Sequence, residues 1–175
     1  PYLWRHGLGG LLADDMGLGK TVETLAFLVR ARAESSVGGR TAPPFVVVAP
    51  ASVVGNWVDE AARFTPEMAV VALPATTKKL GRSLADLAAG ADVVVTSYAV
   101  YRLEFEAFDA LEWSGLILDE AQFAKNPRTR ANQTARRLDA PFKLAITGTP
   151  LENNLTELWA MLAIVAPGLY PSLHR

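Results

Sequence analysis

The stretch GLLADDMGLGKT, residues 10–21, predicts how the chain begins to fold. It opens with a short apolar run that reads as a buried strand, and it leads into a segment with apolar residues at helical spacing. Between the two, Gly17 and Gly19 allow backbone N–H groups to converge on an anion, and the helix N-terminus adds its partial positive charge. A strand, a glycine-containing loop, Gly-Lys-Thr and a helix, in this order, are typical of a phosphate-binding loop.

Each residue of this loop is therefore a candidate for contact with the phosphates of a nucleotide. The set is Asp14, Asp15, Met16, Gly17, Leu18, Gly19, Lys20 and Thr21. Lys20 would reach the β- and γ-phosphates, and the Thr21 hydroxyl would be a ligand of Mg²⁺. The general pattern begins with glycine where this chain has Asp14, so the match is incomplete. A glycine-rich turn in front of a helix-capping threonine is the structural alternative.

Further apolar runs follow the first one and alternate with segments of helix length. They lie at residues 45–48, 70–73, 93–95, 116–118 and 144–146. Because these runs are apolar on both faces, they resemble strands of a parallel sheet that is covered by helices on both sides. We therefore expect an α/β fold, a three-layer open and mainly parallel sheet, formed as a single domain over residues 1–175.

Apolar stripes predict helices in three of the intervening segments. They lie at 22–29, at 53–64 before Pro66, and at 155–162, where Asn154 and Glu157 have the spacing of a capping box. In an open parallel sheet, ligands bind where the strands end, so function is expected in the loops that follow the strands.

A second chemical motif, GLILDEAQ, lies at residues 115–122 and places two carboxylates after an apolar run. Asp119 could hold Mg²⁺, and Glu120 could orient and deprotonate an attacking water. Buried carboxylates need a metal or a basic partner such as Lys20. A solvent-exposed turn is the alternative for this motif alone, but the phosphate loop makes a shared nucleotide site the better interpretation.

Composition narrows the class of protein. Half of the 175 residues are hydrophobic, there is no cysteine, and 17 basic side chains nearly balance 18 acidic ones. Disulfides and thiolate metal sites are excluded, and bulk charge gives no reason to expect nucleic acid. The basic stretch 125–143 is one local candidate for such binding, with a solvated helix surface as its alternative. We expect no membrane-spanning segment and a cytoplasmic location, associated with the nucleoid if the source is bacterial.

Taken together, the motifs resemble the Swi/Snf-type branch of the superfamily-two helicase-like ATPases. Five blocks match in order, at residues 12–21, 49–60, 96–98, 119–126 and 147–159. In this family an aspartate commonly opens the phosphate loop, which explains Asp14. Many relatives carry histidine where this chain has Gln122, so the link from the nucleotide site to the last block would come from an amide without a titratable charge.

The resemblance implies a RecA-like lobe, a P-loop NTPase, that binds ATP and Mg²⁺ and follows the backbone of double-stranded DNA without reading its sequence. It implies catalytic roles for Lys20, Glu120 and Gln122. It also implies DNA contacts from Ser52, Asn56, Thr96, Ser97, Lys125, Thr147 and Thr149. Small hydroxyl side chains suit phosphate contacts of this kind, although helix capping is an equal alternative for Ser52.

The resemblance also implies a partner, the second RecA-like lobe of the same parent chain, which carries the arginines that the family uses in hydrolysis. We therefore expect this lobe alone to be nearly inactive as an ATPase. Two other functions compete with a DNA translocase. One is a phosphate-loop kinase or switch protein, which has no need of Thr-Gly-Thr-Pro at 147–150, and the other is a docking module without turnover.

Overall fold

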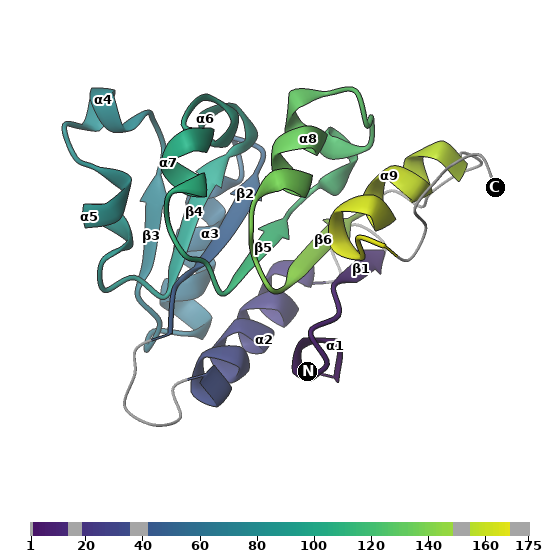
Figure 1. Cartoon of the computed structure of the whole chain (residues 1–175). Helices are drawn as coiled ribbons and strands as arrows, with labels where there is room; N and C mark the ends of the chain where they lie inside the picture. The colour runs from purple at the N-terminus through teal and green to yellow at the C-terminus, as the bar shows by residue number, and fades with distance from the viewer. Residues whose placement is uncertain (1, 14–18, 36–41, 149–154, 169–175) are drawn as a thin grey trace.

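The computed structural model describes residues 2–13, 19–35, 42–148 and 155–168. Its strands form one six-stranded sheet in the order β1-β6-β5-β2-β4-β3, and every neighbouring pair is parallel (Figure 1). The strands are β1 (Gly10–Ala13), β2 (Phe45–Ala49), β3 (Val70–Leu73), β4 (Val93–Ser97), β5 (Gly115–Leu118) and β6 (Lys143–Thr147). Each apolar run that the sequence predicts to be a strand is one, and the open parallel α/β sheet is confirmed.

The three helices expected from apolar stripes are present as α2 (Lys20–Ser35), α3 (Val54–Phe64) and α9 (Leu155–Val165). The predicted capping box of α9 involves Asn154, which lies outside the described residues. Shorter helices complete the fold: α1 (Tyr2–Arg5), α4 (Thr77–Leu80), α5 (Leu84–Ala88), α6 (Tyr98–Leu103), α7 (Phe105–Asp109), the 3-10 helix η1 (Ala121–Ala124) and α8 (Arg130–Arg137). Among the described helices, none is long and apolar enough to cross a membrane.

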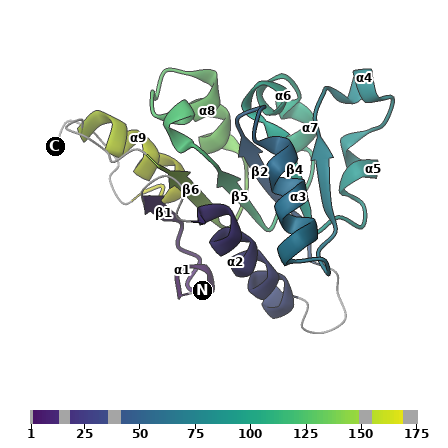
Figure 2. The ribbon, with the colours of Figure 1, turned by 180° about the vertical axis from the view of Figure 1, so that it is seen from behind.

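Helices cover both faces of the sheet because alternate residues of each strand point to opposite sides. Phe45, Val47 and Ala49 of β2 pack with α2 and α3, which Figure 2 shows in front of the sheet. Val46 and Val48 point the other way, into a core formed with helices α5 to α9 (Figure 1). This arrangement leaves the loops at the carboxyl ends of the strands free for function.

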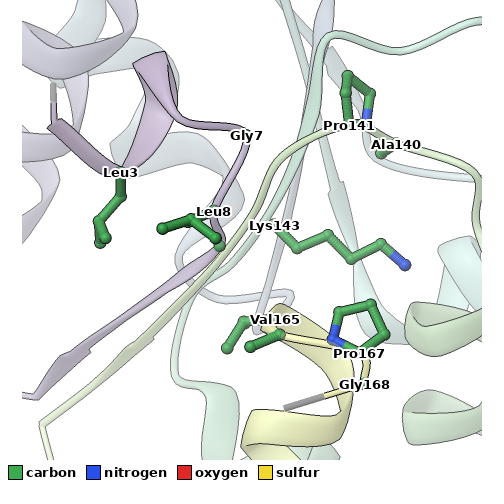
Figure 3. Close-up of a pocket in the computed structure, with 11 residues that line it drawn as sticks. Leu3, Gly7, Leu8, Ala140, Pro141, Lys143, Val165, Pro167 and Gly168 are labelled. Atoms are coloured by element: carbon green, nitrogen blue, oxygen red, sulfur yellow. The ribbon is translucent and has the colours of Figure 1, made fainter.

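At the opposite, amino end of the sheet, the segment before β1 packs closely against the end of α9. A Cβ atom on Gly9 would lie 1.7 Å from the carbonyl oxygen of Val165, so only glycine fits there. Beside this contact lies an apolar pocket of about 630 Å³ lined by Leu3, Leu8 and Val165 among others (Figure 3). None of the described residues predicted to bind nucleotide, Mg²⁺ or DNA in the five matched blocks lines this pocket.

The position of Lys143 contradicts part of the basic surface that we expected at residues 125–143. Its side chain is buried, and its Nζ donates to the carbonyl oxygens of Ala135 and Arg136 at 2.9 Å each, at the end of α8. Figure 3 shows it directed away from Leu3 and Leu8. Burial lowers the pKa of Lys143 from 10.5 to about 8. Lys143 therefore joins β6 to α8 and does not belong to a nucleic-acid surface.

Candidate functional site

Three adjacent strands bring the predicted nucleotide residues together. β6 pairs with β1 on one side and with β5 on the other, and Ala13 at the end of β1 lies opposite Thr147 at the end of β6. In the sequence, the phosphate loop follows β1, the acidic motif continues from β5, and Gly148 follows β6. Since parallel strands end at the same edge of a sheet, these three segments begin at one edge. This is the edge at which ligands bind in open α/β sheets.

The phosphate loop is described only at its end, because Asp14 to Leu18 lie outside the described residues. Gly19 has a left-handed φ of 77°, which few side chains allow, and its carbonyl accepts from Glu23 N at 3.0 Å. Lys20 is the first residue of α2, and Thr21 follows it, half-buried. Lys20 and Thr21 therefore stand at the N-terminus of a 16-residue helix, where an anion is favoured.

Asp119 follows β5 directly, and its carboxylate is held on both oxygens. Oδ2 accepts from the indole Nε1 of Trp57 at 2.8 Å, and Oδ1 accepts from the backbone N–H of Glu120 at 2.9 Å. Burial raises the pKa of the Asp119 carboxyl, while the two hydrogen bonds and the nearby charge of Lys20 act in the opposite direction. A carboxylate held in this way, without full hydration, suits a divalent cation.

Glu120 has an unusual backbone and a defined side chain. Its φ of 48° and ψ of 54° place it in the left-handed region, and among the described residues no other non-glycine has a positive φ. Its Oε2 accepts from Nε2 of Gln122 at 2.7 Å, and Oε1 of Gln122 accepts from the Thr147 hydroxyl at 3.1 Å. The amide of Gln122 therefore connects Glu120 to the end of β6.

The residues predicted to contact DNA differ in how exposed their side chains are. Ser52 and Asn56 are exposed around the start of α3, and Lys125 is exposed and pairs with Glu157 at 3.0 Å. Thr147 is buried and bonded to Gln122, and Thr149 lies outside the described residues.

Two neighbouring hydroxyls at the end of β4 are engaged within the fold. Ser97 caps α6 by accepting from Val100 N at 3.2 Å. Thr96 is 0% exposed, and its hydroxyl donates to the carbonyl of Leu73 at 2.9 Å. The expectation that the Thr96 side chain contacts a phosphate is corrected here, because its hydroxyl joins β4 to β3.

A surface groove of about 540 Å³ lies beside this edge, between the loop after β2, the start of α6 and the start of α8. Tyr98 and Phe123 line it with stacked rings, their centroids 5.5 Å apart at an interplanar angle of 21°. Ser52, Arg102 and Arg130 also line it. The groove offers hydroxyls and guanidinium groups, which contact phosphate and sugar in protein–DNA complexes, beside the exposed ring of Phe123.

The sequence placed Trp57 in an apolar stripe and in the matched block at 49–60, and Tyr98 in the block at 96–98, but it predicted no contact with the site for either residue or for Phe123. Trp57 is 0% exposed and reaches Asp119 across 62 positions of sequence, and the Tyr98 hydroxyl donates to the Asp119 carbonyl at 2.9 Å. An apolar stripe at helical spacing is the ordinary sign of a helix core, so the indole N–H of Trp57 left no separate signal.

Comparison with known proteins agrees with this geometry. A family model described as the SNF2-related domain matches residues 2–175. The chain is 38% identical over 172 residues to the protein YwqA of Bacillus subtilis, with 98% of this chain and 18% of that protein covered. It is 37% identical over 172 residues to the ISWI chromatin-remodeling complex ATPase CHR11 of Arabidopsis thaliana, with 97% and 16% covered.

Among solved structures, the chain resembles the Sulfolobus solfataricus SWI2/SNF2 ATPase core in complex with double-stranded DNA. The TM-score is 0.81 at 34% sequence identity, over 98% of this chain and 34% of that chain. The chain thus spans less than a fifth of the two curated relatives and about a third of the solved core.

Proposed function

Because the chain belongs to the SNF2-related family of helicase-like ATPases, we propose that it is the nucleotide-binding lobe of a motor that hydrolyses ATP to move along double-stranded DNA. The proposal rests on one chain of hydrogen bonds, from Gln122 to Glu120 and from Thr147 to Gln122. It lies next to Asp119, at the edge of the sheet where α2 begins. A carboxylate that is oriented through an amide and a hydroxyl is suited to positioning water rather than to structural support.

The nucleotide would lie with its phosphates at the N-terminus of α2. Lys20 offsets the charge of the β- and γ-phosphates, and Asp119 with the Thr21 hydroxyl would hold Mg²⁺. The fit is supported by the burial of Asp119, because a buried carboxylate is stable in its ionised form only when it is paired or coordinates a metal. The metal would neutralise charge on the phosphate oxygens during transfer.

We assign Glu120 as the general base. Its carboxylate would take a proton from water as the water oxygen bonds to the γ-phosphorus. The bond from that phosphorus to the β–γ bridging oxygen breaks in the same displacement, and ADP and inorganic phosphate are released. Gln122 fixes one carboxylate oxygen of Glu120 by its 2.7 Å hydrogen bond, which leaves the other to face the water.

Double-stranded DNA is the proposed polymer. The solved core that the chain resembles is described in complex with double-stranded DNA. In this chain Ser52, Arg102 and Arg130 line one groove at the carboxyl edge of the sheet. Contacts of this kind fix position on the backbone and carry no sequence information directly, so binding should be independent of sequence.

The second partner that we propose is another RecA-like lobe. Charge that develops on the transferred phosphoryl group must be met by cations on its far side, and an arginine of this kind is worth about 10³ to 10⁵ in rate in related enzymes. This chain matches only 34% of the solved core that it resembles, so the rest of such a core is long enough to hold a second lobe that supplies these arginines.

The test is steady-state ATP hydrolysis by the intact protein with and without duplex DNA. We expect DNA to accelerate turnover, Lys20→Ala to weaken nucleotide binding in calorimetry, and Glu120→Gln to bind ATP while losing about 10²- to 10⁴-fold in turnover. Glu112→Gln, an exposed carboxylate away from the site, is the matched control. Turnover by Glu120→Gln equal to that of the control would remove Glu120 from the mechanism.

A further inference from the structure

Tyr98 touches both the groove and the acidic motif. Its ring lines the groove and stacks on Phe123, which is 57% exposed. Its hydroxyl, at the other end of the same rigid side chain, donates to the backbone carbonyl of Asp119 at 2.9 Å. A single residue therefore connects the surface proposed for DNA with the residue that precedes Glu120.

The hydrogen bond from Tyr98 reaches the one peptide unit whose orientation sets φ of Glu120. The carbonyl of the 119–120 peptide accepts from Tyr98, and its N–H donates to Oδ1 of Asp119 at 2.9 Å. Trp57 holds the other oxygen of that carboxylate. Both ends of the peptide plane are thus fixed while Glu120 has its left-handed φ of 48°. A left-handed glutamate persists only where its surroundings determine it, and these bonds do so.

We propose that Tyr98 is a positioning residue that makes the orientation of Glu120 depend on occupancy of the groove by a duplex backbone. A backbone that packs on Phe123 and pairs with Arg102 and Arg130 would restrict the Tyr98 ring, and the ring would hold the Asp119 carbonyl. Without DNA the Tyr98 bond described above should break more often, and each time it breaks the 119–120 peptide can rotate toward an ordinary φ, which moves the Glu120 carboxylate. This inference rests on the proposed function, since it assumes that Glu120 activates water and that the groove takes DNA.

The same helix offers a matched control. Tyr101 also lies on α6 and also donates from its hydroxyl to a backbone carbonyl, that of Thr134 at 3.2 Å. Its bond leads to α8 and not to the acidic motif. Tyr98→Phe and Tyr101→Phe therefore remove the same kind of bond from the same element while keeping each ring.

The experiment compares these variants in the intact protein, with thermal denaturation to show that both are folded. For Tyr98→Phe we expect the DNA-stimulated kcat to fall by about tenfold, which corresponds to the loss of one hydrogen bond. The KM for ATP and the Kd for duplex DNA should change by less than roughly threefold, because the bond acts on orientation and not on binding. Tyr101→Phe should keep the wild-type kcat.

Hydrogen exchange gives a second measurement that does not depend on turnover. In the wild type, duplex DNA should slow exchange of the amides at residues 119–122, and Tyr98→Phe should lose this protection while still binding DNA. Equal effects of both tyrosine variants, or parallel changes in kcat, KM and Kd, would overturn the coupling and leave the proposed function standing. A wild type without DNA-stimulated hydrolysis would instead overturn the proposed function itself.

Discussion

At the scale of single residues, Glu120 shows how the site is built with backbone strain. A non-glycine residue in the left-handed region costs about 1–3 kcal/mol, and proteins keep such residues mainly where they serve a function. Here φ is 48°. The peptide that precedes Glu120 is held by two hydrogen bonds: its carbonyl accepts from the Tyr98 hydroxyl, and its N–H donates to the Asp119 carboxylate. This backbone conformation directs the Glu120 carboxylate toward Gln122, whose amide also bonds to Thr147 at the end of β6.

This backbone predicts an inverted order of stability for two substitutions that both delete the carboxylate. Glu120→Gly should be more stable than Glu120→Ala by about 1 kcal/mol, because glycine enters the left-handed region without steric cost. At a position with ordinary φ the alanine variant would be the more stable one. Urea denaturation of the two variants measures the difference directly. An alanine variant as stable as the glycine variant would show that residue 120 is not left-handed in solution.

At the scale of elements, Lys143 ties the beginning of β6 to the end of α8, and its burial makes this contact sensitive to pH. A lysine whose pKa is lower in the folded state binds fewer protons there than in the unfolded chain. Its burial therefore costs stability at neutral pH, and this cost is relieved as the pH rises from about 8 toward 10.5.

Lys143→Met should remove this dependence while keeping the length of the side chain. Between pH 7 and 9.5 the free energy of unfolding of the wild type should rise relative to that of Lys143→Met, by about 2 kcal/mol. The difference between the two proteins excludes the other groups that titrate in this range. Chemical denaturation at several pH values is the measurement, and parallel curves for the two proteins would contradict a lowered pKa of Lys143.

The elements also show what sequence could and could not predict. The strands were predictable because each is a continuous apolar run, and α2 and α3 because their stripes are long enough to show a helical period. Helices such as α6 and α7, of six and five residues, are too short for periodicity to reveal.

At the site, the identity of Asp119 and Glu120 as candidates came from adjacent carboxylates after a strand, and these assignments remain predictions. The bond between Trp57 and Asp119 depends on how α3 packs on the sheet, which no local pattern encodes. Thr96 was mistaken for a surface hydroxyl because its acceptor, the carbonyl of Leu73, belongs to a neighbouring strand.

At the scale of the whole molecule, the groove and the predicted nucleotide residues lie at the same carboxyl edge of one sheet. Two arginines, Arg102 and Arg130, line the groove that we propose binds DNA. Arg102→Ala and Arg130→Ala should each weaken duplex binding uniformly across sequences and reduce the slope of log affinity against log salt by about 1. Arg63→Ala is the control, because it removes the same charge from an exposed position. Arg63 lies in the last turn of α3, at the end of the helix opposite to Ser52 and Asn56. Fluorescence anisotropy at several salt concentrations gives the slopes.

An unchanged slope in both groove variants would place the DNA elsewhere on the molecule. A loss of affinity for one duplex sequence only would contradict recognition through the backbone. Either result would leave the ATP site as proposed, since neither arginine belongs to it.

The strand order has a consequence for how the protein acquires its nucleotide site during synthesis. Among the strands of the described residues, β1 lies at the edge of the sheet and pairs only with β6, which is the last of them in sequence. The strand that introduces the phosphate loop is therefore made before its partner and must wait for residues 143–147 to emerge before it can pair. Contacts so distant in sequence form late and slow folding. A nascent chain that stops short of β6 has the complete phosphate loop in its sequence and no framework to hold it.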